Sequence, residues 1–278
     1  MTGNPVEPAS HLELASDCAR CSGLCCVALQ FAKSSAFAES KPVGEPCANL
    51  GADHRCTIHD HLRDSGWSGC TVFECYGAGQ RLTASHGSWR DSAHPGRLFT
   101  SFTALQSLHE VIFLLRHAPA TDRRTDVEVA DLLAEATAAA TVVEQTAEEG
   151  LSVAEIWAPI GPIRSRVGAL LTSISSQLRA HATGADYSYA DLAGRDLRAQ
   201  HLVGGSLRGA VLIAADLRET DLHQADLLGA DLRDCDVRGS SLNGALFLTQ
   251  PQINAARGDA QTTLPPGLRR PSHWLSAN

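Results

Sequence analysis

The stretch that decides the fold is residues 185–247, ADYSYADLAGRDLRAQHLVGGSLRGAVLIAADLRETDLHQADLLGADLRDCDVRGSSLNGALF. A large apolar residue recurs in it at every fifth position. A small residue mostly stands two positions earlier, and the position between them is usually Asp. Neither an α-helix nor a β-strand has a period of five, so another regular structure is required. The thirteen large positions are Tyr187, Leu192, Leu197, Leu202, Leu207, Leu212, Leu217, Leu222, Leu227, Leu232, Val237, Leu242 and Phe247.

This A-D-L-x-x phrase resembles the pentapeptide-repeat family. The resemblance implies a right-handed, four-sided β-helix with one pentapeptide on each side. It also implies that the large and the small residue point inward while the other three positions face solvent. Each coil of such a solenoid buries its interior against its neighbours, and the ends need caps. The expected inward small residues are Ala185, Ala190, Gly205, Ala210, Ala215, Ala225, Ala230, Cys235, Ser240 and Ala245.

The two ends of the rod differ in sequence. Arg195 and Gln200 stand at inward small positions early in the rod, which predicts an imperfect first coil covered by the preceding segment. The tail from Thr249 is expected to supply the other cap, with Trp274 closing the open core.

Residues 97–182 predict helices that form a small bundle. One helix is expected to open with a capping box from Thr125 to Glu128 and to end at Gly150. Ser152 and Glu155 form a second capping box. Pro159 and Pro162 are then expected to interrupt the chain before a last helix. The apolar positions at helical spacing are Leu98, Phe102, Leu105, Ile112 and Leu115, then Val129, Leu132, Leu133, Ala136, Ala140 and Val143, then Ile163, Val167, Leu170, Leu171, Ile174 and Leu178.

Eight of the nine cysteines fall within the first 75 residues. In a reducing cytosol, clustered cysteines are more often metal ligands than disulfides, although free or disulfide-linked thiols are the alternative. Eight thiolates make about two four-ligand sites, and both zinc and an iron–sulfur cluster suit such ligands. The candidate ligands are Cys18, Cys21, Cys25, Cys26, Cys47, Cys56, Cys70 and Cys75.

The order C-x2-C-x3-C-C, followed by Cys56-Thr57-Ile58-His59 and Cys70-x4-Cys75, resembles the CxxCxxxCC family of zinc- or iron-chelating domains. The resemblance covers about residues 14–80. His59 replaces a Tyr of the family pattern, whereas Cys70 to Cys75 follows its ending closely. The resemblance implies metal ligands without specifying a reaction.

The neighbours of these cysteines carry further expectations. Successive side chains of an extended segment point to opposite sides, so Cys25 and Cys26 are expected to serve different sites, or one of them to remain a non-ligand. Gly77 and Gly79 fit a turn whose N–H groups could donate to ligand sulfurs, and a plain loop turn is the alternative. His54, His59 and His61 flank Cys56 and are expected to be surface or supporting residues, while Cys235 is expected in the core of the rod.

Charge and targeting signals narrow the function. The formal net charge is −8, which does not favour generic binding to nucleic acid. The N-terminal residues show no secretory pattern, and no run of about 18 apolar residues occurs, so we expect a cytoplasmic protein without membrane contact.

The chain therefore predicts a multi-domain α+β protein. Its expected parts are a cysteine-rich metal-stabilised module at 1–96, a helical bundle at 97–183, a pentapeptide solenoid at 184–248 and a cap at 249–278. Phosphate loops and H-E-x-x-H motifs are absent from the sequence, so catalysis has little support. We expect a metal-binding scaffold or regulator that presents the rod to a protein or protein-rich assembly. The alternatives are an iron–sulfur redox sensor or oxidoreductase, and a DNA mimic that acts on a topoisomerase.

Overall fold

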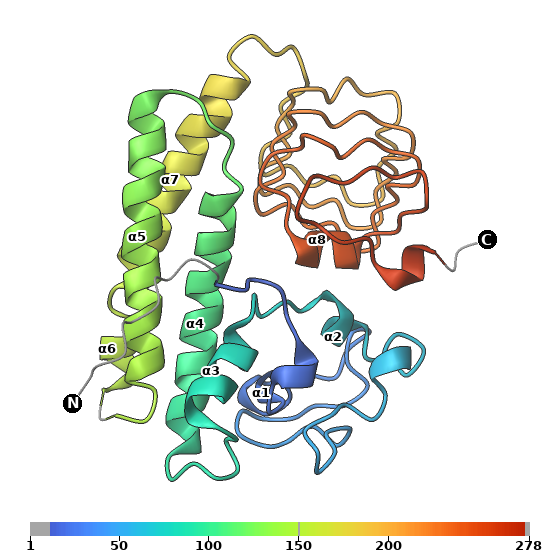
Figure 1. The fold of residues 1–278 in the computed structure, drawn as a ribbon. Coiled ribbons are helices and arrows are strands. Elements are labelled where there is room, and N and C mark those ends of the chain that lie inside the picture. Colours follow the sequence, from blue (N-terminus) through green and yellow to red (C-terminus); the bar gives the residue numbers. More distant parts are fainter. Residues whose placement is uncertain (1–11, 150, 276–278) are drawn as a thin grey trace.

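The computed structural model describes residues 12–149 and 151–275. Figure 1 shows three parts in this range: a lobe of short helices and loops, a set of long helices beside it, and a coiled rod. The start of the expected module and the end of the expected cap lie outside the described residues. In chain order the helices are η1 (Cys18–Arg20), α1 (Leu24–Ala28), η2 (His59–His61), α2 (Ser68–Val72), α3 (Ala78–His86), α4 (Pro95–Arg116), α5 (Arg123–Gln145), α6 (Val153–Trp157), α7 (Ile160–Leu178), α8 (Gln250–Ala255) and η3 (Ser272–Trp274).

The long helices α4, α5 and α7 lie side by side (Figure 1). Helix α4 is central, because α1 and α3 of the cysteine lobe contact it as well as α5, α6 and α7. A helix with partners on several sides is apolar around most of its circumference. By length and composition α4 could cross a membrane, but 72% of its most apolar stretch is buried inside the fold, as in any core helix.

Two helix starts test the predicted capping boxes. The box at Ser152 is confirmed: the Glu155 N–H donates to the Ser152 hydroxyl, and the Ser152 N–H donates to the Glu155 carboxylate. The box at Thr125 is wrong, because α5 begins earlier, where Asp122 accepts the Thr125 N–H at 2.9 Å. A carboxylate that caps the orphan N–H groups and faces the positive helix end makes Asp122 the better cap. Helix α5 ends at Gln145, and the predicted stop at Gly150 lies outside the described residues.

The rod is a β-solenoid with twenty residues in each coil. Parallel bridges link Asp186 to Ser206, Ser206 to Asp226 and Asp226 to Leu246. Four pentapeptides therefore complete one turn, and isolated bridges rather than ordinary strands join the coils. The inward assignment of the large residues is confirmed from position 192 to position 242, because every one is buried in the rod core. Phe247 departs from it: this side chain is buried in the core that includes α4, and Leu248 packs into the rod core instead.

Aspartates before the large residues shape the corners of the rod. At the Asp221 corner, for example, the carboxylate accepts the backbone N–H of His223 at 2.9 Å. Such Asx contacts stabilise a turn locally. The residue two after the large one then often takes a positive φ, as at Gly229 with φ of 69° and Glu219 with φ of 59°. Only the glycine adopts this conformation without strain.

The ends of the rod match the prediction only in part. Trp274 is 1% exposed and packs into the rod core with Ile253 and Ala256, so the predicted cap is confirmed. Its indole N–H donates to the Ala256 carbonyl at 2.9 Å. Arg195 and Gln200 are exposed, so the expected cover over the first coil is wrong at both positions. Polar side chains at an open end need no cover because water solvates them.

The rod is held on two sides. Its flank lies along α7, and its capped end faces the cysteine lobe through α8, which contacts α2 (Figure 1). At that end the Arg63 guanidinium donates to the Asn254 carbonyl at 2.6 Å. Leu246 and Phe247 of the last coil belong to the same core as α4. The rod is therefore built into the fold rather than attached by a linker.

Candidate functional site

Seven of the eight clustered cysteines divide between two hydrophobic environments, and the eighth, Cys18, is exposed beside the first. We call Cys18, Cys21, Cys25 and Cys75 the first thiol group, and Cys26, Cys47, Cys56 and Cys70 the second. In the first group, Cys21, Cys25 and Cys75 belong to the large core that includes α4. The Cys18 side chain is exposed, yet partial desolvation by the surrounding protein raises the pKa of its thiol to about 11, and the nearby thiols of Cys75 and Cys21 add to the shift. All four members of the second group belong to a smaller core beneath the cysteine lobe.

The adjacent pair Cys25 and Cys26 marks the boundary between the groups. Their sulfurs are 3.9 Å apart. Both residues lie in helix α1 rather than in an extended segment, so the expected geometry was wrong. Successive side chains of a helix still diverge by about 100°. One sulfur therefore faces the large core and the other the small one.

Backbone N–H groups donate to sulfurs of the first group. The N–H of Gly79 donates to Cys75, and those of Leu24 and Gly23 donate to Cys21. A Cβ at position 79 would lie 2.7 Å from the Cys21 sulfur, so a glycine is needed there. The Ser16 hydroxyl lies 3.0 Å from the Cys75 sulfur. Donors of this kind stabilise thiolates over thiols.

Backbone N–H groups also donate to sulfurs of the second group, and a cluster of aromatic side chains packs beside these sulfurs. The N–H of Asn49 donates to Cys47, and the N–H of Ile58 donates to Cys56. Burial raises the pKa of Cys70 to about 12, and the thiols of Cys26, Cys47 and Cys56 add to the shift. Below them Phe31 and Phe37 stack at 4.7 Å, and Trp67 packs against both at 5.8 and 6.1 Å.

The sulfurs gather without closing around one point. Among the described residues, no three Cys, His, Asp or Glu side chains meet at distances suited to one ion. His59 and His61 are exposed on η2, and the His54 ring lies 3.1 Å from the Ser88 hydroxyl. Binding of a single ion by either group would therefore require its four sulfurs to draw together.

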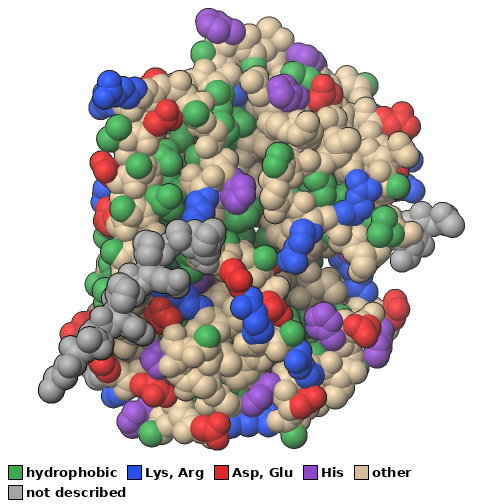
Figure 2. All heavy atoms as spheres, viewed as in Figure 1, with side chains coloured by type: hydrophobic (Ala, Val, Ile, Leu, Met, Phe, Trp, Pro, Cys, Tyr) green, Lys and Arg blue, Asp and Glu red, His purple; other side chains and the backbone are tan. Residues whose placement is uncertain are grey.

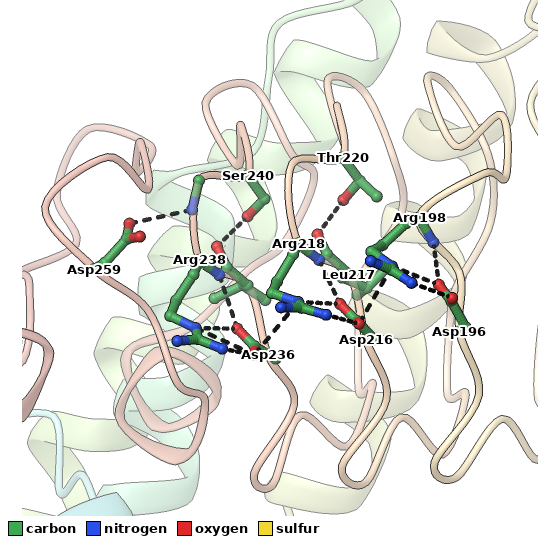
Figure 3. Close-up of polar contacts among 12 residues, drawn as sticks. Asp196, Arg198, Asp216, Leu217, Arg218, Thr220, Asp236, Arg238, Ser240 and Asp259 are labelled. Atoms are coloured by element: carbon green, nitrogen blue, oxygen red, sulfur yellow. Dashed lines mark hydrogen bonds and ion pairs between the residues drawn. The ribbon is translucent and has the colours of Figure 1, made fainter. Parts of the chain in front are cut away.

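A second candidate site is a ladder of ion pairs along one face of the rod, shown in Figure 3. We call Asp196, Arg198, Asp216, Arg218, Asp236 and Arg238 the charge ladder. Each arginine pairs at 2.6 Å with the aspartate two residues before it. Arg198 also reaches Asp216 of the next coil at 3.3 Å, and Arg218 reaches Asp236 at 3.7 Å.

The charge ladder neutralises itself. Hydrogen bonds from Arg198 hold the pKa of Asp196 at about 2, and Arg218 likewise lowers the pKa of Asp216. All six residues are therefore charged at neutral pH, and three negative charges stand beside three positive ones. The three arginine side chains remain 39–50% exposed. This face is polar and mixed in sign rather than acidic.

Comparison with known proteins bears on the whole chain. It is 44% identical over 281 residues to a Bacillus subtilis protein called "Uncharacterized protein YybG", covering 95% of this chain and 96% of that one. The chain belongs to the YybG family. A model of a second family, described as "Pentapeptide repeats", matches residues 190–229 and 206–244 with 8 copies of the repeat. The repeat assignment of the rod is thus confirmed, and this match does not extend to the cysteine lobe.

Two solved structures of pentapeptide-repeat proteins are similar over smaller parts. One comes from the cyanobacterium Cyanothece 51142, with 27% identity, 28% of this chain, 53% of that chain and a TM-score of 0.23. This chain therefore spans about half the length of that protein. The other comes from the thylakoid lumen of Arabidopsis thaliana, with 21% identity, 32% of this chain, 67% of that chain and a TM-score of 0.22.

Cys235 of this YybG-family chain is a core residue of the rod, as predicted. Its side chain is fully buried, and burial raises the pKa of its thiol to about 12. It belongs to the rod core and to neither thiol group.

Three buried charged or titratable residues near the thiol groups escaped the sequence analysis. Lys41 lies beside the second group, and Glu74 lies beside the first. His109 of α4 contacts the backbone of Tyr76, next to Cys75. No motif marks these residues. One signal was available for Lys41: Lys33 and Lys41 are the only lysines among 23 basic residues.

Proposed function

We propose that this protein is a metal-binding interaction protein, in which two four-cysteine metal sites fold one lobe and the rod presents a surface to a protein partner. The observation that carries the proposal is the division of eight thiols into two groups of four. Four thiolates are the ligand set of structural zinc and of common iron–sulfur clusters. The first and second thiol groups would each hold one such unit.

The donor chemistry of both groups fits metal. Each offers four sulfurs, and N–H groups donate to sulfurs in both. Zinc would supply a closed structural site, and an iron–sulfur cluster would supply one-electron chemistry. Thiols left in an apolar lobe gain little from water, and the short helices around them bury few side chains. Metal binding would then supply much of the folding free energy of this lobe.

The rod supports the second half of the proposal. Figure 2 shows acidic and basic side chains interspersed on the visible face rather than gathered into one field. The charge ladder has the same mixed character, with arginine N–H groups and aspartate oxygens in alternation. Such a face suits the polar surface of a protein. A DNA mimic needs a continuous acidic surface, and here arginines neutralise the aspartates of the ladder.

The interaction half is tested by capture of a partner from native lysate, followed by cross-linking to locate the contact. The test variant carries Arg198→Gln, Arg218→Gln and Arg238→Gln, and Arg233→Gln is the control because Arg233 pairs with Asp231 outside the ladder. We expect a stoichiometric partner that cross-links to the ladder, survives in the control and is lost in the triple variant. Equal capture by all three proteins would reject the ladder as the contact surface. Turnover of a small molecule by metal-loaded protein with no partner would favour an oxidoreductase.

A further inference from the structure

Lys41 is a buried ammonium group at the edge of the second thiol group. It is 8% exposed. Its Nζ donates to the carbonyls of Val27, Leu29 and Pro42, and it lies 4.7 Å above the ring of Phe31. An ammonium has three N–H donors, whereas a neutral amine has two. Burial lowers the Lys41 pKa, but three carbonyl acceptors and a ring face fit the charged form.

The position of Lys41 ties this charge to the thiols. Val27 follows Cys26 directly, and the N–H of Cys47 donates to the Cys26 carbonyl at 2.9 Å. Among the eight clustered cysteines, Cys26 alone has a lowered pKa, first because of its contact with the Cys25 sulfur 3.9 Å away and also because of the Lys41 charge. Bridge hydrogen bonds between Phe31 and Lys41, at 2.9 and 3.0 Å, fix the lysine backbone.

The first thiol group has a charge of the opposite sign. Glu74 is 5% exposed, and its carboxylate accepts from the backbone of Ser16 and of Tyr76 and from the Ser16 hydroxyl. Burial raises the pKa of the neighbouring Cys75, and the Glu74 charge adds to that shift. The exposed Arg269 guanidinium lies 3.9 Å from the other carboxylate oxygen and offsets part of this charge.

We propose that Lys41 is a built-in counter-charge that makes the second thiol group the tighter metal site, while Glu74 leaves the first group the weaker one. The inference rests on the proposed function, namely that both groups bind metal. Four thiols that bind one divalent ion release four protons and leave a unit with two net negative charges. A buried charge is costly unless an opposite charge stands nearby. Lys41 supplies that positive charge to the second group. Glu74 instead adds a further negative charge to the first group.

The test measures Zn²⁺ affinity one group at a time by competition with a chromophoric chelator under reducing conditions. Cys18→Ser with Cys21→Ser leaves only the second group, and Cys47→Ser with Cys56→Ser leaves only the first. In the second-group protein, Lys41→Met should weaken Zn²⁺ binding about 10- to 100-fold, the range seen for residues that support metal ligands. Lys33→Met, at an exposed lysine, should leave the affinity unchanged.

Two further variants separate charge from packing. Lys41→Arg keeps the charge and the donors, so its affinity should stay close to that of the parent. Glu74→Gln in the first-group protein should raise the affinity, in the opposite direction to Lys41→Met. Equal losses in Lys41→Arg and Lys41→Met, or no loss in Lys41→Met, would overturn the counter-charge while leaving metal binding intact. Absence of Zn²⁺ from both single-group proteins and of iron from the parent chain would overturn the proposed function and this inference together.

Discussion

The Asp226 carboxylate is fully buried, and the Arg208 guanidinium of the preceding coil pairs with it at 2.7 Å. Ser175 of α7 also donates to Asp226 at 2.6 Å, and Arg208 donates to the Leu171 carbonyl. This pair has the spacing of the charge ladder on a face that α7 covers. A surface arginine of the repeat thereby becomes part of the joint between rod and helices.

Removal of one partner of this pair should be strongly destabilising. Asp226→Ala leaves the Arg208 charge buried without its counter-ion, and we expect a loss of about 3–5 kcal/mol in the free energy of unfolding. Asp221→Ala is the control, since Asp221 is exposed and only caps a turn, and should lose less than about 1 kcal/mol. Denaturant titration measures both. A similar small loss in both variants would mean that the pair does not join the rod to α7.

The interior of the rod should be sensitive to lost volume. Leu222 is 0% exposed and stacks between coils, so Leu222→Ala should reduce stability by about 2–5 kcal/mol. Asp221→Ala is again the control, because Asp221 is the neighbour of Leu222 in the chain and points outward. If the two alanine variants melt at the same temperature, the rod interior contributes no more than its surface.

A buried histidine should make stability fall in mild acid. His109 donates from Nδ1 to the Tyr76 carbonyl at 2.7 Å, and its Nε2 accepts from Arg81, which is paired with Glu144. Burial lowers its pKa from 6.5 to about 4, so the folded state holds a neutral ring that the unfolded chain protonates first. Stability should therefore decline as the pH falls from 6.5 to about 4, by about 3 kcal/mol, and this contribution should be flat outside that window.

The contribution of His109 is isolated by comparing wild type with His109→Gln at each pH. The difference in free energy of unfolding between the two proteins should change across the window in the stated direction. A difference that stays constant with pH would assign the acid sensitivity to other groups.

The division of the thiols predicts selective metal loss. Cys21→Ser should remove the metal of the first group and leave that of the second, and Cys56→Ser should do the reverse. Cys235→Ser should change neither, because Cys235 lies in the rod core. Elemental analysis of the three purified variants measures this directly. Loss of all metal from each of the first two would indicate one shared site.

The sequence predicted the features that follow from a local pattern in the chain. The period of five located the solenoid and its inward residues, and the Ser152 capping box fell where its two side chains predicted. The capping box predicted at Thr125 does not form, because Asp122, three residues earlier, is the better cap. The exposure of Arg195 and Gln200 depended on where the helices pack, which a repeat pattern does not contain.

The candidate site was foreseen only as a set of cysteines. The sequence identified the eight cysteines as candidate ligands. Their division into two groups depends on which core each face of α1 contacts, and the spacing does not specify this. Lys41, Glu74 and His109 lie near the thiols through contacts between segments distant in the chain. Arg208 looked like any outward arginine of the repeat and is covered by α7, because the fold places that helix along the rod.

The central claim is that two metal sites complete the cysteine lobe. Anaerobic purification, metal analysis and an absorption spectrum of the full chain test it most directly. We expect two zinc ions or two iron–sulfur clusters per chain, and protease sensitivity confined to the cysteine lobe after metal removal. Metal-free protein whose cysteine lobe remained fully protease-resistant would contradict it.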